Sequence, residues 1–221
     1  MHRIYTIWKE LLDLLFPRRC VGCTTVGADL CEACTELIVR NDMELPENTF
    51  APLSYHDRRV REAIHRLKFR GAYSIAQSLA PFLTEALIDI ASDSALFDGK
   101  ETEMLVIPVP LYKKKLRVRG FNQCHYLAQY AVKETHLQNL RIRNDVLVKH
   151  KETESQVKTE SKHIRKHNIR DSFSVPNPEY VRNSVCVILD DVITTGATLR
   201  ECEQVLKKAG ARKVYCLAVA H

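Results

Sequence analysis

From residue 50 onward, the apolar positions alternate between the spacing of strands and that of helices. MLVIPVP (104–110), VCVILDD (185–191) and VYCLAVA (214–220) are largely apolar runs, as expected for strands buried on both faces. FAPLSY (50–55) and SFSV (172–175) predict two further strands. Apolar residues one helical turn apart predict helices over 57–69, 74–90 with a break or kink at Pro81, 122–134 and 197–209. This alternation predicts an α/β fold with a mainly parallel, doubly wound sheet.

A different pattern precedes residue 50. Apolar residues at helical spacing over 3–15 predict a short amphipathic helix that ends at Pro17. A cysteine-rich segment (18–40) and the polar linker NDMELPEN (41–48) follow. We therefore expect a small N-terminal module over residues 1–40 and an α/β domain over residues 50–221.

Four of the eight cysteines form two CxxC pairs separated by seven residues. Each pair can direct two thiolates at one point, so the pairs predict a tetrahedral Zn²⁺ site of structural type. The predicted ligands are Cys20, Cys23, Cys31 and Cys34. A dithiol redox centre and an incidental pairing of cysteines are the alternatives. The remaining cysteines lie within apolar patterns and are expected in the core: Cys124, Cys186, Cys202 and Cys216.

The composition, 45% hydrophobic and 27% charged over 221 residues, is typical of a soluble globular protein. Lys9, Glu10 and Asp13 interrupt the N-terminal stretch where a signal peptide needs an uninterrupted apolar centre. We therefore expect a cytoplasmic protein without a membrane span. The net charge is +6, with basic residues concentrated in 113–119 and 141–170. Such patches favour phosphorylated small molecules, nucleic acid or acidic lipids, and a solvated basic face is the alternative.

Asp190 and Asp191 end the apolar run 185–191, and a Thr- and Gly-rich turn leads from them into the next predicted helix. This order places the acids at the carboxyl edge of the sheet, where open α/β sheets bind ligands. Backbone N–H groups and Thr hydroxyls over 192–198 can converge on an anion at the helix start. Carboxylates accept hydroxyl donors, so the segment predicts a site for a vicinal diol beside a phosphate, such as a ribose 5-phosphate. A strand end that carries two acids by chance is the alternative.

CVILDDVITTGAT (186–198) resembles the thirteen-residue signature with which type I phosphoribosyltransferases bind phosphoribosyl pyrophosphate (PRPP). Over essentially its whole length, the chain resembles the ComF family of competence proteins. The four-Cys module carries this resemblance, together with FAPLSYHDRRVREAIHRLKFRG (50–71), IPVPLYKKKLRVRGFNQ (107–123) and KHKETESQVKTESKHIRKHNIRDSF (149–173). The resemblance implies a type I phosphoribosyltransferase-like fold.

The resemblance also implies roles for individual residues. Asp190 and Asp191 would hold the ribose 2- and 3-hydroxyls of PRPP. The 5-phosphate would be cradled by Thr194, Thr195, Gly196, Ala197 and Thr198. Pyrophosphate would lie at the basic loop after strand 104–110, between Pro110 and Lys113, and would bring Mg²⁺ with it. The residues expected to act in catalysis are Asp190, Asp191 and Arg119, with Lys115 and Arg117 helping to neutralise the leaving group and 149–170 acting as a lid.

Three functions fit these features. One is a PRPP-binding protein of DNA uptake and natural transformation, with single-stranded DNA and a helicase-like competence ATPase as partners. Its DNA-binding residues would be Lys113, Lys114, Lys115, Arg117 and Arg119, with bases stacking on Tyr112, Phe121 and Tyr126. The second is an active phosphoribosyltransferase on a small-molecule acceptor. The third is a catalytically silent adaptor whose zinc module docks a partner.

Overall fold

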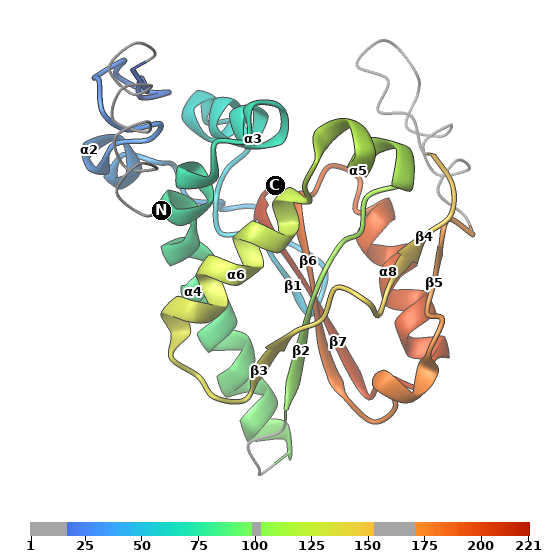
Figure 1. The fold of residues 1–221 in the computed structure, drawn as a ribbon. Coiled ribbons are helices and arrows are strands. Elements are labelled where there is room, and N and C mark those ends of the chain that lie inside the picture. Colours follow the sequence, from blue (N-terminus) through green and yellow to red (C-terminus); the bar gives the residue numbers. More distant parts are fainter. Residues whose placement is uncertain (1–16, 99–102, 153–170) are drawn as a thin grey trace, which may run out of the picture.

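The structure, a computed structural model, describes residues 17–98, 103–152 and 171–221 (Figure 1). The helix expected over 3–15 and most of the 149–170 stretch expected as a lid lie outside these ranges. Within the described part of the chain, no helix is both long enough and apolar enough to cross a membrane.

A five-stranded sheet in which all neighbouring strands are parallel forms the centre of the molecule. Its strand order is β1-β7-β6-β2-β3. The strands are β1 (Thr49–Phe50), β2 (Met104–Pro108), β3 (Leu140–Ile142), β6 (Val185–Val192) and β7 (Lys213–Ala220). The three continuous apolar runs are thus β2, β6 and β7, the middle strands, where both faces are covered.

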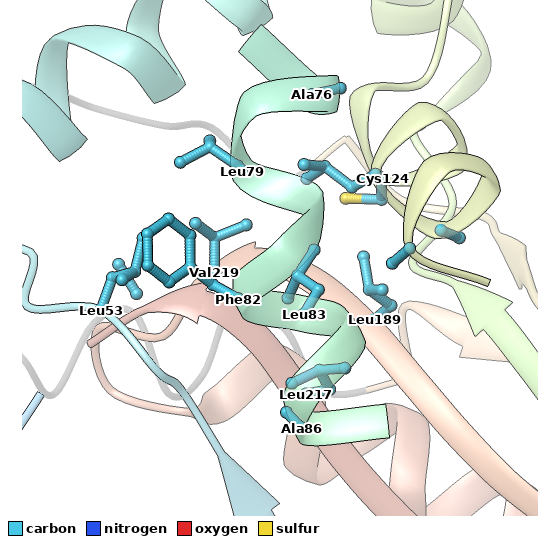
Figure 2. Close-up of a cluster of buried hydrophobic side chains, with 14 of the residues drawn as sticks. Leu53, Ala76, Leu79, Phe82, Leu83, Ala86, Cys124, Leu189, Leu217 and Val219 are labelled. Carbon is cyan, nitrogen blue, oxygen red and sulfur yellow. The ribbon is translucent and has the colours of Figure 1, made fainter. Parts of the chain in front are cut away.

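Helices cover both faces of the sheet, which confirms the doubly wound α/β prediction (Figure 1). One face carries α3 (Arg58–Arg70), α4 (Tyr73–Asp98) and α6 (Gln123–Thr135), and the other carries α8 (Ala197–Lys208). Figure 2 shows the first layer, in which Leu79 and Leu83 of α4 pack beside Leu189 of β6 and Leu217 of β7. Alternate residues of β6 pack against the helices on opposite faces of the sheet, because successive side chains of a strand point to opposite faces.

Three expectations about local structure need correction. α4 is not broken at Pro81 and runs on to Asp98, beyond the expected end at residue 90. Pro81 and Gln77, whose carbonyl loses its usual helical donor, both lie on the exposed side of α4, where water can replace the missing bond. SFSV contributes only β5 (Phe173–Ser174), which pairs antiparallel with β4 (Val148–Lys149) outside the main sheet.

The basic segment after β2 is the third case, because it is a helix rather than a loop. α5 spans Lys113–Arg119 and ends at Gly120, whose φ of 78° gives a left-handed cap. Gly tolerates this conformation without the steric penalty of a side chain. The helical periodicity places the basic residues of this segment on two different faces of α5.

Candidate functional site

The acid pair lies at the carboxyl end of β6, between β2 and β7, as predicted. Asp190 and Asp191 are adjacent in a strand, so their side chains start toward opposite faces. Nevertheless, one oxygen of each carboxylate lies within 4.8 Å of the other and of Cys124 Sγ. The two acids therefore present oxygen atoms close enough for a single small ligand to contact both.

Asp191 is buried and has two side-chain partners. Lys68 Nζ lies 2.7 Å from Asp191 Oδ1, and Gln123 Nε2 donates to Asp191 Oδ2 at 2.6 Å. Arg119 in turn donates to Gln123 Oε1. Lys68 comes from the last turn of α3, and Gln123 is the first residue of α6. The sequence analysis did not identify either residue as part of the site.

Asp190 is half-buried and contacts fewer polar groups. Its Oδ1 accepts the backbone N–H of Asp191 at 2.8 Å and faces Cys124 Sγ at 3.6 Å. Burial, followed by the charge of Asp191, raises the pKa of Asp190 to about 6. Burial raises the pKa of the Cys124 thiol well above its ordinary value, so this cysteine donates a proton to Asp190 rather than acting as a thiolate.

The expected phosphate cradle is the turn between β6 and α8. Gly196 has a φ of 68° and occupies the N-cap position of α8, and no side chain caps this helix. The Ala197 N–H donates a long hydrogen bond of 3.4 Å to Thr195 Oγ1, and the first N–H groups of α8, together with the helix dipole, favour an anion. Thr195, Gly196, Ala197 and Thr198 are each partly accessible here, and Thr194 is exposed.

A cavity of about 320 Å³ lies along the flank of this turn. Thr194, Thr195 and Arg200 line it, but so do Glu44 and Glu203. Acidic side chains disfavour a phosphate. We therefore assign the cradle to the N-terminal N–H groups of α8 rather than to this cavity.

The periodicity of α5 divides its basic residues between two faces. Lys115 and Arg119, one turn apart, are half-buried. Burial lowers the pKa of Arg119, while the nearby charge of Asp191 opposes that change. Lys113, Lys114 and Arg117 are exposed, and Lys114 Nζ lies 3.2 Å from Glu152. Lys113 lies on the exposed face of α5, and its predicted contact with pyrophosphate stays a prediction.

Lys149 of β4 is a further cation near the acid pair. Burial and the charge of Lys115 lower its pKa, and Asp190 opposes that change. Burial and the charges of Arg119 and Lys68 likewise lower the pKa of Lys115. Three cations therefore interact with the acid pair and a fourth, Lys115, interacts with those cations, and we call the four the cation cluster: Lys68, Lys115, Arg119 and Lys149. Their mutual repulsion favours binding of a polyanion.

Aromatic side chains surround the basic helix. Tyr73 lies 4.4 Å from Tyr126 and 5.2 Å from Phe121 between ring centroids, so these rings pack together. Tyr112 is half-buried at the N-cap of α5. Phe69 is 67% exposed, and the Arg119 guanidinium lies 5.4 Å from its ring centroid. Phe69, which the sequence analysis did not single out, is thus an accessible ring beside the cations.

The two CxxC pairs converge on one point. All four Sγ atoms lie within 4.8 Å of one another, with Cys20 and Cys23 at 3.5 Å and 3.6 Å from Cys31. Tetrahedral zinc–thiolate coordination at about 2.3 Å per bond requires sulfur separations of nearly this size. The cluster can therefore hold a metal such as zinc. Cys124, Cys186, Cys202 and Cys216 are buried, as predicted.

The phosphoribosyl transferase domain family matches residues 137–221, which include the acid pair and its cradle. Competence protein F of Haemophilus influenzae is 32% identical over 164 residues, covering 71% of this chain and 66% of that protein. The DNA utilization protein YhgH of Escherichia coli K12 is 31% identical over 156 residues (70% and 64%). Competence protein ComFC of Bacillus subtilis is 26% identical over 172 residues (78% and 62%).

The matched regions thus span slightly less than two thirds of the length of these relatives. A solved structure of the allosteric regulatory enzyme of purine biosynthesis has a TM-score of 0.34 and 17% identity, covering 65% of this chain and 26% of that one. That similarity is too weak to add to the assignment. The domain match, the curated relatives and the parallel sheet with its four-Cys cluster agree with one another. The chain therefore belongs to the ComF family of competence proteins, with a phosphoribosyltransferase-like domain of type I fold.

Proposed function

We propose that this chain binds PRPP at the carboxyl edge of β6 and acts in DNA uptake. The main support is one juxtaposition: an acid pair, an uncapped helix N-terminus and four cations at the same sheet edge. PRPP carries a diol, a phosphate and a diphosphate, and each has a chemically suited partner there. The relatives' names, competence protein and DNA utilization protein, support the biological role.

In this proposal different residues bind different parts of PRPP. Asp190 and Asp191 accept hydrogen bonds from the two ribose hydroxyls. The N–H groups of residues 195–198 and the hydroxyls of Thr194, Thr195 and Thr198 bind the 5-phosphate. The cation cluster faces the diphosphate. We assign Arg119 both to this charge neutralisation and to the orientation of Asp191 through Gln123.

The donor atoms at the acid pair do not fit a magnesium ion held by the protein alone. Both oxygens of Asp191 already have partners, and the third nearby group is a protonated thiol, which is a poor ligand for this hard cation. We therefore expect Mg²⁺ to bind only together with the diphosphate of the ligand.

Titration calorimetry with PRPP and Mg²⁺ tests the binding proposal. The Asp190→Asn/Asp191→Asn double variant should lose most of the affinity, because amides accept the two hydroxyls without the charge-assisted bonds. Asp89→Asn, on the exposed side of α4, is the matched control and should bind as the native chain does. Equal binding by the native chain and the double variant would remove the site assignment.

Phosphoribosyl transfer is a second candidate, because the cation cluster could also neutralise departing pyrophosphate. A nucleophile would then form the new bond at the anomeric carbon while the bond to pyrophosphate breaks. A pyrophosphate-release screen with bases, amines and single-stranded DNA as acceptors tests for turnover. Release that requires an acceptor and is lost in the double variant would establish transfer.

We assign contact with single-stranded DNA to the outer face of α5 and its neighbours. Lys113, Lys114 and Arg117 are exposed on that face, and Phe69, which is exposed at the end of α3 beside Arg119, offers a ring for base stacking. A helicase-like ATPase as partner, a cytoplasmic location and the division into a zinc module (1–40) and a phosphoribosyltransferase-like domain (50–221) complete the proposal. The four-Cys cluster would bind zinc for a structural purpose, because four protein ligands leave no open coordination position.

A further inference from the structure

Lys68 forms an ion pair with Asp191, one of the two carboxylates to which the proposed function assigns the ribose hydroxyls. Lys68 Nζ lies 2.7 Å from Asp191 Oδ1, and the Asp191 side chain is only 7% exposed. Although burial favours a neutral amine, the Asp191 charge raises the pKa of Lys68. The lysine is therefore charged, and the pair is a strong contact in a largely dry environment.

Of the two partners of Asp191, Lys68 is the one able to move. Gln123 is buried, and Arg119 holds its amide oxygen, which fixes the orientation of the amide toward Asp191. The Lys68 side chain is 25% exposed and carries its charge on a flexible four-carbon stem. A hydroxyl that binds Asp191 Oδ1 therefore competes with the lysine for this oxygen.

A displaced Lys68 has a suitable destination nearby. The charge of Lys68 contributes to the lowered pKa of Lys115. The Arg119 guanidinium lies 5.4 Å from the ring centroid of Phe69, the residue that follows Lys68 in α3. The end of α3 thus lies against the inner face of α5, where the diphosphate is assigned. An anion at that position would accept charge-assisted hydrogen bonds from the Lys68 ammonium group when it leaves Asp191.

We propose that Lys68 is a specificity-determining residue that couples recognition of the diol to recognition of the diphosphate on the same ligand. This inference rests on the proposed function. A pentose phosphate with a diol but no diphosphate weakens the ion pair and offers the lysine no new partner. PRPP weakens the same pair but supplies a diphosphate as a new partner for the lysine, so Lys68 favours PRPP over ribose 5-phosphate.

Calorimetry with two ligands tests this role. PRPP and ribose 5-phosphate, each with Mg²⁺, are titrated into the native chain, Lys68→Met, Lys68→Gln and the control Lys207→Met, whose residue lies exposed on α8. In both Lys68 variants PRPP should bind about tenfold more weakly, as expected for the loss of one charge-assisted hydrogen bond. Ribose 5-phosphate should bind more tightly, because no ion pair opposes it. The preference for PRPP should therefore fall by more than about tenfold.

Thermal melting of each variant checks the fold. Lys68→Gln retains a hydrogen-bond donor for Asp191, so it can replace Lys68→Met in the test if Lys68→Met does not fold. Lys68→Arg retains the charge and should keep the preference for PRPP. If the native chain binds PRPP and the Lys68 variants change both affinities by the same factor, the inference is wrong and the proposed function stands. If the native chain does not bind PRPP, the inference about Lys68 and the proposed function are both wrong.

Discussion

Ser74 Oγ donates a hydrogen bond of 2.5 Å to Asp29 Oδ2, which ties the four-Cys module to the first turn of α4. Asp29 is buried, so its carboxylate depends on such a donor. The module also contacts α3, where Asp57 Oδ2 accepts the Val39 N–H at 3.0 Å. The module is therefore fixed to the helices of the α/β domain by polar side chains as well as by apolar packing.

Ser74→Ala should lower the free energy of unfolding by about 1–3 kcal/mol, because it leaves a buried acceptor without its donor. Urea unfolding measures this loss. Ser92→Ala removes an exposed hydroxyl from the same helix and should change stability by less than about 0.5 kcal/mol. Similar losses in the two variants would show that the Asp29 contact contributes little.

Gly22 is required by the geometry of the first CxxC pair. A Cβ at this position would lie 2.6 Å from Cys34 Sγ, closer than real contacts allow. Gly22→Ala should therefore shift the ligands and speed the loss of zinc to a chromophoric chelator. Ala33, the exposed residue at the corresponding place in the second pair, gives the control Ala33→Ser, which should release zinc as slowly as the native chain.

The raised pKa of Asp190 predicts a pH dependence of stability with a definite sign. Between its ordinary value of 3.8 and about 6, the folded chain holds this proton more tightly than the unfolded chain does. The Asp190 contribution to stability therefore falls as the pH rises through this window. Asp190→Asn should lose this dependence and exceed the native chain in stability at neutral pH by up to about 3 kcal/mol.

Unfolding in urea at a series of pH values checks the Asp190 prediction. Asp89→Asn on the exposed face of α4 should show the native pH dependence. Identical pH profiles for the native chain and Asp190→Asn would contradict the burial of this carboxyl.

The two faces of α5 should differ in their contribution to DNA binding. Replacement of Lys113, Lys114 and Arg117 by alanine should weaken binding of single-stranded DNA and reduce the slope of log affinity against log salt by about 2, because each phosphate contact contributes about 0.7. Binding of PRPP should be unchanged, since these side chains are exposed on the outer face.

A matched triple variant keeps the net charge comparable. Lys133, Lys207 and Lys208 are exposed on α6 and α8, and their replacement by alanine should leave the salt slope near the native value. If both triple variants reduce the slope equally, DNA binding reflects overall charge rather than the outer face of α5.

Much of the fold was accessible from local sequence because burial leaves a direct pattern. β2, β6 and β7 are the middle strands, and they are the three continuous apolar runs. β1 and β5 have only two residues each, so no periodicity could define their limits. α5 was expected as a loop because its seven residues have five charges and only two apolar positions, too few to show a buried stripe.

The sequence by itself determined that an acid pair ends a buried strand before a Thr- and Gly-rich turn and a helix, and that four cysteines lie close enough to share a metal. These features depend on neighbours along the chain. Only the tertiary structure decided that Lys68 pairs with Asp191, that Lys149 joins the cations, and that Lys115 and Arg119 face inward while Lys113 does not. Packing of α3, α5 and β4 around one sheet edge sets these charges side by side, and no local pattern encodes contacts between segments so far apart.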